Sequence, residues 1–121
     1  MRIQSIIAAA ALLAIAATVS AHPRLVSASP TPNAAVASPL HVHLRFSERL
    51  MPAFSRGGIT MAAMQGMRAM KVASSAKLEA DGKTLTIEPN ARLARGRYVV
   101  DWHVVSVDTH KVSGSYAFAV K

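Results

Sequence analysis

His22 carries the most informative chemistry in the sequence, provided that a signal peptidase cuts the chain after Ala21. The new first residue would then offer both a free α-amine and an imidazole. These two nitrogens can close one chelate ring on an ion, and a bidentate nitrogen donor of this kind suits Cu(II). Pro23 follows and has no backbone N–H, so it cannot supply a deprotonated amide as a further ligand. The other ligands must therefore come from elsewhere in the fold.

Asp108 and His110 are the candidates for those further ligands. They stand two residues apart just after a predicted strand, and in extended backbone their side chains would project from the same face. One amine, two imidazoles and a carboxylate form a nitrogen–oxygen donor set that favours Cu(II) over softer ions. Taken alone, an Asp-x-His step is more typical of a turn aspartate beside a surface histidine. Its occurrence together with His22 in one short exported domain favours the metal site.

A second candidate site is a run of methionines spaced three residues apart. These residues are Met61, Met64, Met67 and Met70. The spacing matches neither the alternation of a strand nor a straight helical stripe, and an irregular loop could gather several thioethers around one ion. Thioethers are soft donors that select Cu(I). The alternative is a short amphipathic helix whose methionines pack on the core.

The remaining histidines are expected to be structural or solvent-exposed. His41 and His43 fall on the polar face of a predicted strand, and His103 points away from the face that carries Trp102. The sequence contains no nucleophile–base–orienter pattern and no glycine-rich phosphate loop.

The first 21 residues have the three parts of a secretory signal peptide. Arg2 provides a positive start, residues 6–17 are an unbroken apolar run, and residues 19–21 end in a small-x-small cleavage pattern. The apolar run is short for a transmembrane span, although a retained anchor remains the alternative. We therefore expect residues 1–21 to be a signal peptide and residues 22–121 to form one soluble domain.

Composition narrows the possible partners and donors. The chain has no cysteine, so thiolate metal sites and disulfides are excluded. The formal charge of +8 could favour polyanions. However, the basic residues are scattered and aromatic residues are few, which argues against nucleic-acid binding.

Short alternating segments separated by turn residues predict an all-β sandwich or barrel. Residues 40–46, 98–105 and 115–120 alternate with period two. The faces expected in the core are Leu40, Val42, Leu44 and Phe46; Tyr98, Val100, Trp102 and Val104; and Tyr116, Phe118 and Val120. Asp81-Gly82 predicts a hairpin, and the pair Gly57-Gly58 is expected to break the chain before the next strand.

Four segments carry a family resemblance: HPRLVSASP at residues 22–30, Phe46-Ser47-Glu48, the methionine run, and the ending from Gly96 to Gly114 with its VDW and DTH steps. Together they resemble the CopC/PcoC family of periplasmic copper-binding proteins. The resemblance extends over residues 22–121. It implies a Greek-key fold of cupredoxin or immunoglobulin-like type, with about seven strands, that binds copper without turnover.

The resemblance also implies roles for individual residues. His22, Asp108 and His110 match the Cu(II) ligands of the family, and Glu48 matches a glutamate near that ion, either outside the ligand set or as a weak axial ligand. Members with a methionine-rich loop hold Cu(I) there, which points to Met61, Met64 and Met67. A histidine usually joins these methionines, and this chain has none between residues 57 and 81, so Met70 would take its place at a different spacing.

We therefore expect a non-enzymatic periplasmic copper carrier or buffer in copper resistance or homeostasis. It would be a soluble monomer that passes copper to an inner-membrane copper transporter or a periplasmic copper oxidase. One alternative is an oxidative copper enzyme, because an N-terminal histidine with a second histidine is also typical of the histidine brace of polysaccharide monooxygenases. Against it, Asp108 would fill a coordination position that oxygen chemistry needs open. The other alternative is a metal-free β-sandwich that binds a membrane partner.

Overall fold

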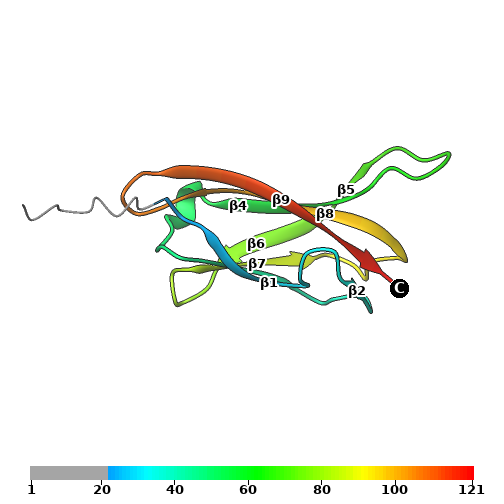
Figure 1. Cartoon of the computed structure of the whole chain (residues 1–121), viewed down its shortest axis with the longest axis horizontal. Helices are drawn as coiled ribbons and strands as arrows, with labels where there is room; N and C mark the ends of the chain where they lie inside the picture. Colours follow the sequence, from blue (N-terminus) through cyan, green and yellow to red (C-terminus); the bar gives the residue numbers. More distant parts are fainter. Residues whose placement is uncertain (1–21) are drawn as a thin grey trace, which may run out of the picture.

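The protein is a two-layered β-sandwich, seen in a computed structural model that describes residues 22–121 (Figure 1). The expected signal peptide lies outside the described residues. The first sheet has the strand order β1 (Leu25–Ser29), β3 (Val42–Phe46), β7 (Thr84–Pro89) and β6 (Ser74–Leu78). The second has the order β2 (Ala35–Val36), β9 (Lys111–Val120), β8 (Gly96–Val105), β4 (Arg56–Met61) and β5 (Met70–Val72). The all-β prediction is confirmed, with nine strands rather than about seven because β2 and β5 are short additions at sheet edges.

One 3-10 turn, η1 (Pro52–Phe54), interrupts the strands, and residues 22–121 contain no α-helix. No helix in this part of the chain is long and apolar enough to cross a bilayer.

The core lies between the two sheets and follows from the alternation of the strands. Its buried apolar residues are Val42, Leu44, Phe46, Leu50, Ile59, Leu85, Ile87, Leu93, Tyr98, Val100, Trp102, Val104, Phe118 and Val120. Trp102 packs edge-on against Phe46 with ring centroids 6.1 Å apart, and so joins the two layers. Gly114 faces Trp102 across the β8–β9 ladder, where a β-carbon would come within 2.5 Å of the indole. Only glycine therefore leaves room for the ring at this position.

Two expectations about this core are wrong. Leu40 is 80% exposed, because the ladder of β3 begins only at Val42 and the chain before it is not held against the second sheet. The glycine pair does not break the chain but lies inside β4. A β-carbon on Gly57 would stand 2.7 Å from the Ile87 side chain, so glycine allows β4 to approach the opposite sheet closely.

The longest ladder determines where the candidate site residues lie. β8 and β9 pair without a break from Gly96↔Val120 to Val105↔Lys111. Residues 106–110 therefore form the turn at one end of the sandwich, close to the start of β1 (Figure 1). Met61 pairs with Tyr98 near the other end of β8, and the hairpin that follows β4 projects beyond the body there (Figure 1).

Candidate metal centre

The turn between β8 and β9 is tight, and not extended as expected. The Ser106 N–H donates to the His110 carbonyl at 2.9 Å, and the Thr109 N–H donates to the Ser106 carbonyl at 2.8 Å. Thr109 closes the turn in the left-handed region, with φ of 74°, which is uncommon for a β-branched residue. Asp108 and His110 are therefore brought together by a turn and not by the pleat of a strand.

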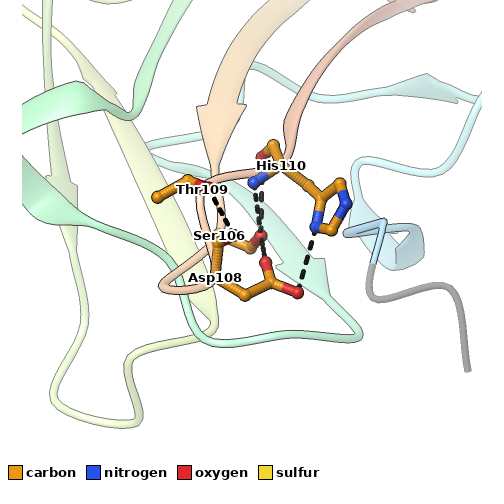
Figure 2. A network of polar contacts seen from close by, with 4 residues as sticks. All are labelled: Ser106, Asp108, Thr109 and His110. Atoms are coloured by element: carbon orange, nitrogen blue, oxygen red, sulfur yellow. Dashed lines mark hydrogen bonds and ion pairs between the residues drawn. The ribbon is translucent and has the colours of Figure 1, made fainter. Parts of the chain in front are cut away.

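Within this turn the Asp108 carboxylate is bonded to the imidazole of His110 (Figure 2). Asp108 Oδ2 lies 3.0 Å from His110 Nδ1, and Oδ1 accepts a hydrogen bond from the Ser106 hydroxyl. The Ser106 hydroxyl first, and the His110 ring second, lower the pKa of Asp108 below its usual value. The carboxylate is thus held in its anionic form, and Nε2 of His110 stays available to an ion.

Ser106 is the site residue that sequence reasoning did not assign. It is 1% exposed, and its hydroxyl accepts a hydrogen bond from the His110 N–H at 3.3 Å in addition to donating to Asp108. One buried hydroxyl therefore orients both halves of the Asp-x-His step. The available signal was a serine two residues before the aspartate, but serine is too common in β-turns for that spacing to stand out.

His22 reaches this turn from the other end of the described chain. Its ring lies 4.6 Å from that of His110, centroid to centroid, in an edge-on arrangement at 69°. The start of β1 is held by two hydrogen bonds: the Arg24 N–H donates to Ser47 Oγ at 2.9 Å, and the Ser47 N–H donates to the Arg24 carbonyl at 2.8 Å. The structure therefore brings two of the predicted ligands, His22 and His110, into direct contact.

Glu48 lies on the segment that connects these two parts. Its neighbour Ser47 is bonded to Arg24, and the carbonyl of its other neighbour, Arg49, accepts a hydrogen bond from Val107 at 2.9 Å. The Glu48 side chain is half-buried, and within residues 22–121 its carboxylate has no hydrogen-bond or ion-pair partner. Its backbone is thus held beside the site while its carboxylate stays uncommitted.

These groups form a partial donor set. Among residues 22–121, no three histidine, aspartate or glutamate side chains converge in the geometry of a metal cluster. What the described chain provides is two imidazoles side by side and a carboxylate bonded to one of them. A carboxylate in this position can either join the ligands or hold the imidazole in the tautomer that binds metal through Nε2.

The methionine run is neither an irregular loop nor a helix. Met61 pairs with Met70 across β4 and β5, and Met64 and Met67 exchange hydrogen bonds of 3.1 and 2.8 Å around a two-residue turn. Gly66 takes the left-handed conformation that this turn needs, with φ of 79°. The spacing of three was misleading because residues 62–63 and 68–69 leave the ladder between the two methionine pairs.

Two of these methionines share one surface. The ε-methyl of Met61 and the sulfur of Met64 both lie within 4 Å of the place where a β-carbon on Gly96 would stand. Met64, Met67 and Met70 are 44%, 48% and 56% exposed. The methionine hairpin, residues 61–70, therefore presents accessible thioethers at the end of the sandwich opposite the turn of Figure 2.

His103 is exposed, as expected, on the outer face of the second sheet. Its Nδ1 lies 2.8 Å from Ser113 Oγ, while Asp101 Oδ2 stands 3.9 Å from Nε2. The second distance is too long for an orienting hydrogen bond. This trio therefore does not form a catalytic triad.

Fold and donor set together define the class: a small β-sandwich with histidine, carboxylate and thioether donors at its ends. The CopC domain family matches residues 25–121. Copper resistance protein C from Xanthomonas campestris pv. juglandis is 45% identical over 119 residues, covering 97% of this chain and 93% of that protein. Copper resistance protein C from Escherichia coli is 40% identical over 121 residues, covering 98% and 96%. The crystal structure of PcoC, a methionine-rich copper resistance protein from Escherichia coli, superposes with a TM-score of 0.78 at 44% identity, covering 84% of this chain and all of that one.

The chain belongs to the CopC family. The relatives named above are copper resistance proteins, and copper binding is the role that this membership supports. The family resemblance inferred from the sequence is thereby confirmed.

Proposed function

We propose that the protein is a periplasmic copper carrier or buffer that binds Cu(II) through His22, Asp108 and His110. The observation that carries the proposal is the contact between the rings of His22 and His110, 4.6 Å apart, beside the Asp108 carboxylate. Removal of residues 1–21 would add the α-amine of His22 to this set and complete four nitrogen and oxygen donors. Such a set favours Cu(II). Glu48, whose neighbours are bonded to both halves of the site, is a weak axial ligand or lies just outside the ligand set.

The proposed cycle is binding and release without chemical turnover. Copper is the cargo, and the receiving partner is an inner-membrane copper transporter or a periplasmic copper oxidase. The exposure of His22 and His110 supports such transfer, because an ion held by surface groups is reachable by the ligands of a partner. The protein itself acts as a soluble monomer after export.

Blocking the amine is the direct test. Protein that begins at His22 is titrated with Cu(II), and the d–d absorbance and electron spin resonance spectrum are recorded. A form of the protein whose His22 α-amine is acetylated keeps every side chain but loses this donor. We expect its Cu(II) affinity to fall at least about tenfold, equivalent to about 1.4 kcal/mol. Equal affinity of the two forms would remove the amine from the site and overturn the proposal. The intact mass of the exported protein, expected to begin at His22, is the necessary companion measurement.

A second function, Cu(I) binding at the methionine hairpin, is favoured by the approach of Met61 and Met64 to one surface over Gly96. Met67 and Met70 complete the thioether donors, and no histidine lies in this segment. Soft thioethers select Cu(I). Titration with Cu(I) under anaerobic conditions tests it: stoichiometric binding is expected, and its absence would leave only the Cu(II) site.

An oxidative enzyme is the competing function at the same residues. Here Asp108 is held beside His110 by two hydrogen bonds, so a carboxylate occupies the space that an oxygen ligand would need. We expect no copper-dependent oxygen consumption when the copper-loaded protein receives a reductant. Oxygen consumption accompanied by glycan cleavage would decide for the enzyme.

A further inference from the structure

His41 and His43 form a pair on the outer face of the first sheet. Val42, which lies between them, and Leu44, which follows His43, are fully buried. The alternation of β3 therefore turns both imidazoles outward. The two rings are nearly parallel, with centroids 5.7 Å apart and an interplanar angle of 27°. The strand holds the two imidazoles next to each other, so only small side-chain movements are needed for both to bind one ion.

His43 is held in the manner of a metal ligand. Its Nδ1 lies 3.0 Å from the hydroxyl of Thr86, its partner across the β3–β7 ladder. Thr86 is a polar residue that is only 3% exposed, so this hydroxyl is fixed by the sheet around it. The contact orients the ring and leaves Nε2 of His43 free. Metal-binding histidines characteristically use their second nitrogen in this way.

A carboxylate stands next to His41. Val42 pairs with Ile87, which places His41 opposite Glu88 one step further along the ladder, and Glu88 Oε2 lies 3.8 Å from His41 Nε2. This distance exceeds that of a hydrogen bond, and the two side chains are 43% and 60% exposed. The carboxylate is thus near enough to reach an ion at the imidazoles and free to move toward it.

We propose that His41, His43 and Glu88 form a second site for a divalent transition metal, independent of the N-terminal amine. Imidazole nitrogens with one carboxylate suit Cu(II), Ni(II) and Zn(II), and among these Cu(II) binds most tightly. Water fills the remaining positions because the site is open. Lys77, which pairs with Thr86, and Arg45 on β3 bring positive charge to the same face. We therefore expect weaker binding than at the site of His22, Asp108 and His110.

The second site is separate from the first in space. Ser47, which is bonded to Arg24 beside His22, is six residues from His41 along an extended strand, or roughly 20 Å at 3.3 Å per residue. Asn90 and Arg92, which border the hollow beside His41, also border the hollow beside Met61 and Met70. The proposed site therefore lies toward the methionine end of the sandwich and cannot share an ion with His110.

The experiment separates the sites with His22→Ala and His110→Ala together in the exported protein, which removes both imidazoles of the first site. Titration of this variant with CuCl₂, followed by electron spin resonance and nitrogen hyperfine splitting, should show one residual equivalent with imidazole ligands. Adding His41→Ala and His43→Ala should abolish it. The matched control is His103→Ala, which removes an exposed histidine from the other sheet and should leave the residual equivalent intact.

The Thr86 hydroxyl, which orients the His43 ring, provides a second test of the site. Thr86→Val keeps the volume but removes the contact with His43, and should weaken the residual equivalent about tenfold. Thr86→Ser restores the hydroxyl and should restore the affinity. A residual equivalent that survives the loss of both histidines, or no residual equivalent at all, overturns the second site. Neither outcome affects the N-terminal site. Failure of that site would appear as the same number of bound Cu(II) equivalents in the wild type and in the variant that carries both His22→Ala and His110→Ala.

Discussion

The two ends of the sandwich present different donors and assemble them in different ways. The histidine end collects His22, Asp108 and His110 from the first and last parts of the described chain, and its groups meet only because β1 and the β8–β9 ladder end at the same place. The methionine hairpin is one continuous segment that pairs with itself. From Tyr98, beside Met61, to Ser106 the chain runs eight residues of extended strand, roughly 25 Å. The hard, nitrogen-rich end therefore depends on the whole fold, whereas the soft, sulfur-rich end depends on a local turn.

The largest expected effect comes from His110→Ala. This change removes an imidazole that contacts both His22 and Asp108, so the tight Cu(II) equivalent should be lost while Cu(I) binding at the hairpin stays unchanged. Cu(II) titration by spin resonance and Cu(I) competition with a chromophoric chelator measure the two ends separately. His103→Ala is the control for loss of an exposed histidine. A parallel fall in Cu(I) affinity would show that the ends are coupled and would break the comparison.

The complementary change acts on the other end. Replacing Met61 and Met64 by leucine keeps side-chain volume but removes two thioethers, and each lost donor should cost about tenfold in Cu(I) affinity, about a hundredfold together. Cu(II) binding should not change. Met51→Leu, a methionine outside the hairpin beside η1, is the matched control. Unaltered Cu(I) affinity in the double variant would mean that the hairpin methionines are surface residues only.

A smaller effect is expected from Ser106→Ala. Without the buried hydroxyl, the Asp108 carboxylate loses the bond that orients it, and Cu(II) affinity should fall about tenfold. Ser113→Ala, which removes a hydroxyl bonded to His103 on the outer face, serves as control in the same titration. If both serine variants bind Cu(II) like the wild type, the turn is shaped by its backbone alone.

A change in a second turn that contains an aspartate, Asp81, should have no effect on metal binding. Thr84 Oγ1 and the N–H groups of Lys83 and Thr84 donate to the Asp81 carboxylate, and in that order they lower the pKa of Asp81 from 3.8 to about 2. Because the pKa is lower in the folded state, the carboxylate stabilises the fold above pH 4, and this contribution is lost as the pH falls toward 2. Asp81→Asn should therefore lower the urea midpoint at pH 7 and converge with the wild type near pH 2. A change in its Cu(II) affinity would contradict the purely structural role of this turn.

Much of the fold could be predicted because burial on one face imposes a period of two. The alternation in residues 98–105 identified the core face of β8, and Asp81-Gly82 identified the β6–β7 hairpin, both as observed. The expectations that Leu40 is buried and that Gly57 breaks the chain failed for the same reason. Whether a residue belongs to a ladder, and how closely the opposite sheet approaches it, depends on partners that are distant in sequence.

The candidate site was predictable in its chemistry and less so in its geometry. Asp108 and His110 do meet, but through a left-handed Thr109 and a buried Ser106 that the expectation of extended backbone did not include. The methionine hairpin was misjudged because its spacing of three was compared with regular strands and helices, whereas two paired steps separated by irregular residues produce the same spacing.

The sequence by itself determined which donors the protein can offer. It contains imidazoles, carboxylates and thioethers and no thiol, and a proline after His22 closes the route to an amide nitrogen ligand. The tertiary structure alone decided which donors meet. His22 reaches His110 because Arg24 and Ser47 hold the start of β1 at the end of the sandwich where β8 turns into β9. Residue types establish ligand chemistry one at a time, but coordination requires several groups within a few ångströms of one point, and only the pairing of distant strands provides that.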